Sequence, residues 1–247
     1  MSAPLRVLVV GASSGVGHAV ARALAAGGSP VAAVARRGDR LAGLTAEAPG
    51  RVSAIVGDVG AEAGCGEAVA AAVRALGGLD AVVYAAGVSD MALVKDTGFD
   101  EWRRILDTNV IGMARVFAHA REQLVASRGQ MVALSSVSEM RPKPGLVAYA
   151  ASKAALRKLI EGLRTENPEV AFTLVSIGPT GPTEFGRGFD PGVMEAMKAR
   201  WIAGGFLAPG RMTVEDVAAR IIDCLTAPMR TEDLVLLPRP TPEDLPS

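Results

Sequence analysis

The sequence predicts an α/β fold in which a doubly wound parallel β-sheet of about seven strands carries helices on both faces. Short apolar runs alternate with longer stretches rich in Ala and Leu along nearly the whole chain. Several of the short runs are apolar throughout, as in strands that are buried on both faces of a sheet. No Pro/Ser-rich linker or internal repeat interrupts this alternation, so residues 1–247 are predicted to form a single domain.

The predicted elements follow one another in strict alternation. We expect strands at residues 5–10, 30–35, 52–56, 81–84, 130–134, 170–177 and 234–237. We expect helices at residues 16–26, 40–47, 62–76, 99–127, 149–166 and 214–225. Strand–helix units of this size join neighbouring strands by right-handed crossovers, and such connections build a parallel sheet.

Two segments depart from this rhythm. Residues 180–211 follow the sixth strand, are rich in Gly, Pro, Met and aromatic residues, and are too long for an ordinary connection. Because ligands bind outside the carboxyl ends of parallel strands, we predict that this segment is a substrate lid. Its apolar residues fit a hydrophobic substrate or a subunit interface. Residues 238–247 contain four prolines and predict an irregular tail.

Composition excludes several functional classes. With 49% hydrophobic residues among 247, the chain can bury a large core, which excludes global disorder. Its 26 basic and 26 acidic side chains cancel, so we expect neither a nucleic acid nor an anionic membrane surface as a partner. The two cysteines lie far apart and suggest no disulfide framework or metal site. Without a signal peptide or an apolar run of about 18 residues, the chain is expected to be cytoplasmic.

A glycine-rich turn directly follows the first predicted strand. It reads Gly11-Ala-Ser-Ser-Gly15-Val-Gly17 and runs straight into a helical stretch. Glycines allow a tight turn and close approach to a pyrophosphate, whose charge then faces free N–H groups at the helix N-terminus. At a strand-to-helix junction this pattern predicts a dinucleotide site. The residues expected to contact the cofactor are Gly11, Ser13, Ser14, Gly15, Val16 and Gly17.

A second motif carries acid–base chemistry. Tyr149 and Lys153 are four residues apart in a predicted helix and therefore lie on one face. A free tyrosine has a pKa of about 10, and a neighbouring ammonium lowers that pKa toward neutrality. The alternative is an interior tyrosine beside a surface lysine. Ser136, thirteen residues before Tyr149, ends the fifth strand, where its hydroxyl can polarise a substrate carbonyl.

Together these motifs resemble the short-chain dehydrogenase/reductase superfamily, over residues 5–183 and more weakly through residue 237. The resemblance implies a Rossmann-type fold and hydride transfer between a nicotinamide and a carbonyl or secondary alcohol. It makes Tyr149 the general acid/base and Ser136 the group that stabilises the developing alkoxide. Lys153 lowers the tyrosine pKa and holds the nicotinamide ribose. Asn109, in the sequence Asp107-Thr-Asn109-Val-Ile-Gly, completes a proton relay.

The resemblance also assigns cofactor contacts beyond the glycine turn. These positions are Asp58, Val59, Ala85, Ala86, Gly87, Tyr149, Lys153, Pro179 and Thr183. Asp58 is expected to accept a hydrogen bond from the adenine amino group. The family's Asn-Asn-Ala-Gly motif departs here, because Tyr84 and Ala85 replace both asparagines. Local stabilisation around this loop must therefore differ from that of relatives.

The residues after the second strand favour NADP(H). An acid at this point binds the ribose hydroxyls of NAD(H), whereas an arginine holds the 2′-phosphate of NADP(H). Neutral Ala35 ends the strand, and Arg36 and Arg37 follow it. The nearby Asp39 is predicted to cap the next helix. NAD(H) stays open as the alternative cofactor.

A rival function shares the same fold. A catalytically silent dinucleotide-binding regulator would sense the cofactor and bind a partner without turning over a substrate. Because the four residues of the catalytic motif are all present, the sequence favours the enzyme.

The resemblance further implies assembly into a homodimer or a homotetramer. Relatives pair through the two long helices of the catalytic region, here residues 99–127 and 149–166. Val116, Leu156 and Leu163 are expected to belong to the apolar face of this contact. The prolines after the last strand cannot donate ladder hydrogen bonds, so a second interface at that strand is less certain than the first.

Overall fold

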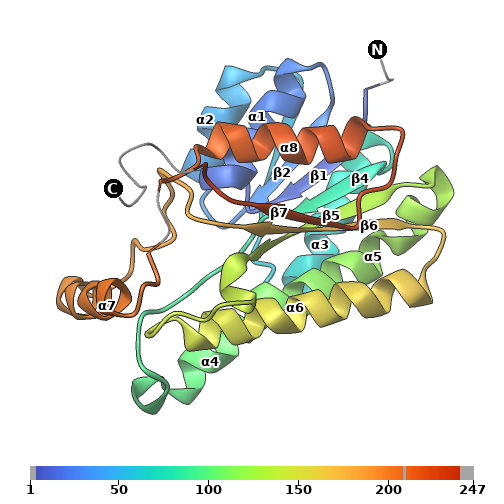
Figure 1. Cartoon of the computed structure of the whole chain (residues 1–247). Coiled ribbons are helices and arrows are strands. Elements are labelled where there is room, and N and C mark those ends of the chain that lie inside the picture. Colours follow the sequence, from blue (N-terminus) through green and yellow to red (C-terminus); the bar gives the residue numbers. More distant parts are fainter. Residues whose placement is uncertain (1–3, 208–209, 240–247) are drawn as a thin grey trace.

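The computed structural model, which describes residues 4–207 and 210–239, is built around one sheet of seven parallel strands (Figure 1). Their spatial order is β3-β2-β1-β4-β5-β6-β7, so the chain runs outward from β1 in one direction and then in the other. The strands are β1 (Val7–Val10), β2 (Val31–Ala35), β3 (Val52–Val56), β4 (Ala81–Tyr84), β5 (Gln130–Ser136), β6 (Ala171–Ile177) and β7 (Asp233–Leu236). This arrangement confirms the predicted doubly wound α/β fold.

Helices fill the connections between the strands. They are α1 (Gly15–Ala26), α2 (Gly38–Glu47), α3 (Glu62–Leu76), α4 (Phe99–Leu106), α5 (Gly112–Ser127), α6 (Val147–Glu166), α7 (Pro191–Ala203) and α8 (Val214–Thr226). Residues 99–127 are helical throughout, as predicted, but an unpredicted π-helical segment at Asp107–Ile111 separates α4 from α5. The prediction also lacked α7, which occupies the middle of the 180–211 segment.

Two helical layers bury the sheet, one on each face (Figure 1). Helices α1, α2 and α8 pack on one face, and α3, α5 and α6 pack on the other. Successive strand residues serve opposite cores: Val7 and Val9 join the first, whereas Leu8 and Val10 join the second. The central strands are apolar throughout because each of their faces meets a helix.

The apolar residues expected at a dimer contact are part of the monomer's own core. Val116 and Leu156 are fully buried and Leu163 is 9% exposed, and all three pack among the residues under α3, α5 and α6. The prediction that they form an outward apolar face is wrong. Long helices that lie against a sheet use their broad apolar stripe to cover it, which leaves the smaller side chains outside.

Among the residues that the structure describes, no helix is long and apolar enough to span a membrane, and no cluster of three or more metal-ligating side chains occurs. Both cysteines are buried free thiols. Pro238 and Arg239 continue from β7 without regular structure, whereas the rest of the predicted tail, residues 240–247, lies outside the described residues.

Gly112 sits where the chain leaves the π-helical segment, and a side chain has no room there. A Cβ would lie 2.4 Å from the Val59 carbonyl oxygen and 2.6 Å from the Tyr84 hydroxyl. We expect Gly112→Ala to lower the free energy of unfolding by about 1–3 kcal/mol. Gly162→Ala is the matched control, because Gly162 lies inside α6 with nothing within 4 Å, and it should stabilise the protein by about 0.5–1 kcal/mol. Urea unfolding would measure both, and equal effects would contradict the prediction.

Candidate active site

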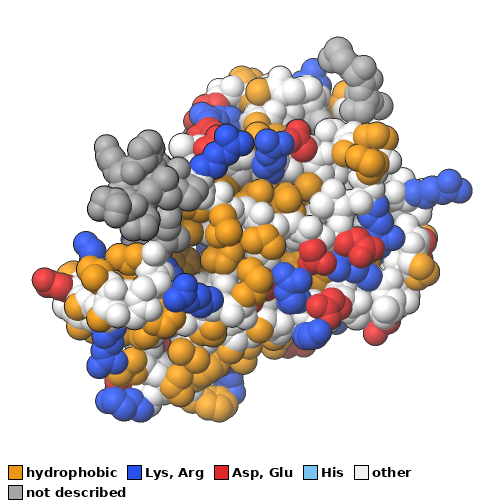
Figure 2. Space-filling view, viewed as in Figure 1, with side chains coloured by type: hydrophobic (Ala, Val, Ile, Leu, Met, Phe, Trp, Pro, Cys, Tyr) orange, Lys and Arg blue, Asp and Glu red, His pale blue; other side chains and the backbone are white. Residues whose placement is uncertain are grey.

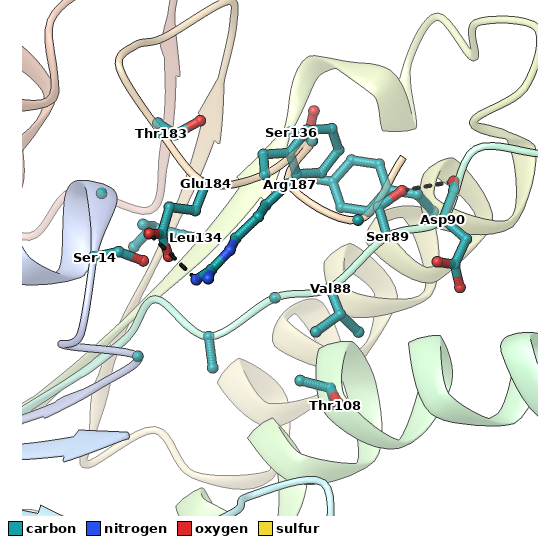
Figure 3. Close-up of a pocket in the computed structure, with 18 of the residues that line it drawn as sticks. Ser14, Val88, Ser89, Asp90, Thr108, Leu134, Ser136, Thr183, Glu184 and Arg187 are labelled. Atoms are coloured by element: carbon teal, nitrogen blue, oxygen red, sulfur yellow. Dashed lines mark hydrogen bonds and ion pairs between the residues drawn. The ribbon is translucent and has the colours of Figure 1, made fainter. Parts of the chain in front are cut away.

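A cleft of about 1470 Å³ opens at the carboxyl ends of the strands (Figure 3). Single drug-sized ligands occupy roughly 300–1,000 Å³, so this cleft has room for a dinucleotide and a second small molecule. Ser14 and Glu184 lie toward one end of the cleft in Figure 3, and Ser89 and Asp90 lie toward the other. Most of the residues predicted for cofactor and catalysis line it, and Gly11, Asp58, Ser136, Tyr149 and Thr183 are among them.

The glycine turn lines the end of the cleft where Ser14 and Glu184 lie, which we call the nucleotide end. Gly11 has a φ of +89°, and a Cβ there would lie 2.6 Å from the Ala86 backbone nitrogen. A Cβ on Gly17 would lie 2.4 Å from the Gly11 carbonyl oxygen. Helix α1 starts at Gly15, and the side chain of its N-cap residue, Ser14, accepts no hydrogen bond from the helix. Free N–H groups at a helix N-terminus beside a surface without side chains fit a pyrophosphate.

The two arginines after β2 take different positions. Arg37 turns toward the glycine turn, where its Nη2 donates to Ser13 Oγ at 2.8 Å and to Ser14 Oγ at 2.9 Å. Arg36 remains exposed, with Nη1 at 3.8 Å from a carboxylate oxygen of Asp58. Asp58 also accepts a hydrogen bond from the Gly60 backbone at 2.9 Å. Both guanidinium groups therefore stand at the nucleotide end of the cleft.

Asp39 does not cap α2 as predicted. The helix begins two residues earlier than predicted, at Gly38, and its N-cap is Arg37, whose side chain makes no capping hydrogen bond. Asp39 lies within the first helical turn, where a negative charge still stabilises the helix dipole.

Tyr84 explains how the loop after β4 holds together without the two asparagines. Its ring is fully buried, and its hydroxyl donates to the Thr108 carbonyl oxygen at 2.6 Å. Burial raises the pKa of Tyr84, so the hydroxyl stays protonated as a donor. This bond links β4 to the π-helical segment. Small Ala85, Ala86 and Gly87 then follow along the cleft.

Asn109 lies in that π-helical segment and is fully buried. Its amide holds the backbone of Val88 from both sides: Oδ1 accepts from the Val88 nitrogen at 2.8 Å and Nδ2 donates to the Val88 oxygen at 2.9 Å. Nδ2 also donates to Ser152 Oγ on α6 at 2.9 Å. The amide thereby ties the loop after β4 to the helix that carries Tyr149 and Lys153.

Ser136, Tyr149 and Lys153 come together at the cleft. Tyr149 is 9% exposed, and burial raises its pKa to about 12, although the neighbouring Ser136 opposes this rise. Burial lowers the pKa of Lys153 to about 8. The Lys153 Nζ donates to the Leu134 carbonyl oxygen at 2.8 Å and lies 5.7 Å from the centre of the Tyr149 ring. The pKa of Tyr149 is therefore raised in the protein alone and not lowered as expected, because desolvation by burial dominates.

Glu139 is a buried carboxylate that the sequence analysis did not single out. Its side chain is 1% exposed and accepts hydrogen bonds from Ser135 Oγ at 2.7 Å, Ser176 Oγ at 2.6 Å and Arg157 Nη2 at 2.7 Å. Arg157 follows Lys153 by one turn of α6 and also pairs with Asp233 at 2.9 Å. The negative charge of Glu139 opposes the lowering of the Lys153 pKa. Two spacings in the sequence could have indicated this ion pair: an acid follows Ser136 by three residues, and an arginine follows Lys153 by four.

The described residues of the 180–211 segment, 180–207 and 210–211, contribute to the lining of the cleft beside Tyr149, which we call the substrate end. Phe185 packs edge-on against the Tyr149 ring, with centroids 4.9 Å apart, and against Phe189, with centroids 5.6 Å apart. Helix α7 docks through Met197 against Met91 and Leu146. Pro179 and Thr183 line the cleft, and a Cβ on Gly15 would lie 3.7 Å from the Thr183 methyl group. The rings of Phe185 and Phe189 therefore form an apolar wall beside the Tyr149 ring.

A glycine turn at the switch between sheet halves, above a parallel α/β sheet, defines a dinucleotide-binding protein of the Rossmann class. A model of the short chain dehydrogenase family matches residues 6–190, and the chain belongs to this family of oxidoreductases. Nicotinamide dinucleotides are the cofactors of this family.

Curated relatives are similar over part of the chain. The 11-beta-hydroxysteroid dehydrogenase-like 3 protein of Arabidopsis thaliana is 38% identical over 179 residues, which cover 70% of this chain and 58% of that protein. The serine 3-dehydrogenase of Agrobacterium fabrum is 32% identical over 174 residues, 70% of each chain. The matched region thus spans little more than half the length of the plant relative.

Solved structures are similar over almost the whole chain. The closed form of serine dehydrogenase complexed with NADP+ superposes with a TM-score of 0.84 at 26% identity, covering 94% of both chains. An alcohol dehydrogenase from the archaeon Thermococcus sibiricus, complexed with 5-hydroxy-NADP, gives a TM-score of 0.80 at 25% identity, covering 93% of this chain and 94% of that one.

Glu139→Gln tests the buried carboxylate. The change keeps the side-chain volume but leaves the Arg157 guanidinium without its buried partner. We expect a loss of about 1–3 kcal/mol in the free energy of unfolding, because the amide replaces a buried carboxylate that accepts three hydrogen bonds, although Arg157 keeps its pair with Asp233. Glu161→Gln removes the same charge from an exposed pair with Lys158 and should change stability by less than about 0.5 kcal/mol. Similar unfolding midpoints for the two variants in urea would refute the prediction.

Proposed function

We propose that this protein is an NADP(H)-dependent oxidoreductase that transfers a hydride between the nicotinamide and a carbonyl or secondary alcohol. The observation that carries the proposal is the meeting of Ser136, Tyr149 and Lys153 at the cleft that also contains the glycine turn. The bound nicotinamide would supply or accept the hydride. The residues of the chain bind and orient the reactants and move the proton.

Each catalytic side chain has a role that its surroundings support. In the reducing direction the Tyr149 hydroxyl gives its proton to the substrate oxygen, and Ser136 donates a hydrogen bond to the same oxygen. The raised pKa keeps Tyr149 protonated at neutral pH, which suits a proton donor. Lys153 then carries positive charge that stabilises the phenolate, and Asn109 holds the loop and helix around this relay.

The oxidising direction needs additional positive charge near Tyr149. With burial setting the pKa at about 12, a phenolate base is scarce at neutral pH. The positively charged ring of the oxidised cofactor is the group that would lower this pKa when it binds. A catalytically silent regulator would have no use for this arrangement, so the enzyme is favoured over the regulator.

Tyr149→Phe separates the two functions. We expect reduction of carbonyl substrates to fall by at least about a hundredfold, because the proton donor is lost. NADPH binding, followed by nucleotide fluorescence, should stay within about twofold, since the glycine turn and arginines are unchanged. Phe185→Leu alters the neighbouring ring but keeps the proton donor, so it should lower this reduction much less than Tyr149→Phe does. An NADPH-consumption screen over ketones, acyl thioesters, quinones and steroids supplies the substrate, and undiminished turnover by Tyr149→Phe would defeat the proposal.

The cofactor is proposed to be NADP(H), with NAD(H) as the alternative. Arg37 offers its guanidinium beside the serines of the glycine turn, Arg36 stands next to Asp58, and Ala35 leaves no acid to hold a free ribose. The remaining contacts proposed from the sequence keep their place along the cleft: Gly11, Ser13, Ser14, Gly15, Val16, Gly17, Val59, Ala85, Ala86, Gly87, Pro179 and Thr183. Structures of NADP-bound relatives support this choice.

Arg36→Ala and Arg37→Ala test the cofactor preference. Loss of a charge-assisted hydrogen bond is worth about 1.5–3 kcal/mol, so each variant should raise the NADPH dissociation constant roughly 10- to 150-fold. NADH affinity should change little, because NADH lacks the 2′-phosphate. Arg22→Ala, on the outer surface of α1, is the control. Equal binding of NADPH and NADH by the unmutated protein would overturn the preference.

We further propose one catalytic domain in which residues 180–211 form a lid over a hydrophobic ketone or alcohol. Phe185, Phe189, Met194 and Trp201 supply an apolar wall along the cleft. A cytoplasmic location is proposed because both cysteines are free thiols, as in a reducing compartment.

Assembly into a homodimer through α5 and α6 is proposed, with a homotetramer as the alternative. Ile111 is 51% exposed, and Ala151 and Ala154 are exposed on α6. Figure 2 shows further hydrophobic side chains near the centre of the drawn face, where Figure 1 shows β7. Val235 of β7 is 45% exposed. We propose that this surface forms the second subunit contact if the protein is a tetramer.

Light scattering measures the assembly. We expect at least twice the chain mass of 25.4 kDa at micromolar concentration. Ala154→Arg should dissociate the dimer, because a twofold contact receives the charge twice. Ala23→Arg, exposed on α1 across the sheet, should leave the mass unchanged. A monomeric wild-type protein would contradict the proposal.

A further inference from the structure

The carboxylate of Glu184 lies among three arginines at the nucleotide end of the cleft. It pairs directly with Arg37, and Arg40 and Arg187 approach it to 3.7 Å. Figure 3 shows the contact with Arg187. Arg37 is 147 residues away in the chain, so the tertiary fold alone brings this pair together. The hydrogen bond from Arg37 and the surrounding positive charge lower the pKa of Glu184, which is therefore an anion at neutral pH.

Arg37 is held in place apart from Glu184. Its Nη2 donates to both serines of the glycine turn, Ser13 and Ser14, and its Nε lies 3.3 Å from Ser13 Oγ. The remaining donor, Nη1, is directed to Glu184. The guanidinium that we propose for the 2′-phosphate is thus already occupied by a carboxylate of the same chain.

We propose that Glu184 is a specificity-determining residue, an internal anion that occupies Arg37 and is displaced from it by the 2′-phosphate of NADP(H). This inference rests on the NADP(H) preference proposed above. A phosphate with about two negative charges and three acceptor oxygens is the stronger partner for a guanidinium, so the exchange is favourable. A nucleotide without the 2′-phosphate has nothing to exchange for Glu184 and leaves it in place.

Displacement of Glu184 would also affect the contacts at the substrate end of the cleft. The next residue, Phe185, packs against the Tyr149 ring at 4.9 Å, and Thr183 on the other side lies against the glycine turn. Glu184 therefore connects the segment that covers the substrate end to the arginine that reads the cofactor. Binding of the phosphate at one end releases a contact that holds the ring over Tyr149 at the other.

Two nucleotides isolate the 2′-phosphate from the rest of the cofactor. Calorimetry would measure dissociation constants of adenosine 2′,5′-bisphosphate and of 5′-AMP for the wild type and for Glu184→Gln. Because the variant removes a competing charge, it should bind the bisphosphate about three- to tenfold more tightly. Its affinity for 5′-AMP should change by less than about twofold, since that nucleotide does not compete with Glu184.

Two further variants locate the effect. Glu195→Gln removes the same charge from an exposed position on α7 in the same segment and should leave both dissociation constants unchanged. In an Arg37→Ala background, Glu184→Gln should lose its effect on the bisphosphate, because the two anions then have no shared partner.

The outcomes separate this inference from the proposed cofactor preference. Unchanged or weaker binding of the bisphosphate by Glu184→Gln would overturn it. So would a loss of 5′-AMP affinity, which would make Glu184 an acceptor for the ribose hydroxyls instead. A wild type that binds both nucleotides equally would refute the NADP(H) preference, whereas the response of Glu184→Gln would still decide whether the carboxylate competes.

Discussion

Close backbone approach between β1 and β4 is the constraint on which the rest of the site depends. The two strands pair in parallel, and the turns that follow them touch: a Cβ on Gly11 would collide with the Ala86 backbone. Because Gly11 has no side chain, the turn before α1 packs directly against the loop after β4, and the N-terminus of α1 lines the cleft. All seven strands end at this same edge, so β5 delivers Ser136 there as well.

The side chains proposed for catalysis are buried, and specific partners compensate for the loss of their hydration. Lys153 places its ammonium on the Leu134 carbonyl oxygen, and Asn109 satisfies both backbone groups of Val88. Behind them Glu139 joins β5, β6 and α6 through two serines and Arg157. A buried charge without such bonds would shift to its neutral form or destabilise the fold. The network therefore gives the reacting groups fixed positions and a low-dielectric environment.

The two ends of the cleft are connected by the segment after β6. Residues 183–185 pass from the glycine turn, through the arginine cluster, to the ring of Tyr149. Helix α7 anchors the far part of the segment through a small apolar cluster with Met91 and Leu146. One stretch of chain thereby contacts both the nucleotide end and the substrate end, which is the geometry that coupled binding of two ligands requires.

Sequence alone determined the features that local periodicity and spacing encode. Apolar runs gave every strand of the sheet within a few residues, the glycine turn marked the start of α1, and the order of Asn109, Ser136, Tyr149 and Lys153 pointed to the family. Each of these signals lies within one turn, one strand or one helical face, where short-range geometry is enough.

Tertiary structure decided what depends on partners far along the chain. The π-helical segment after α4 accepts a hydrogen bond from Tyr84 of β4. The burial of Val116 and Leu156 depends on how closely their helices pack against the sheet. The hydrogen bond from Ser176 to Glu139 and the pairing of Arg37 with Glu184 join segments that no local pattern relates. Even the sign of the Tyr149 pKa shift followed from burial, which is a property of the packed chain and of no single motif.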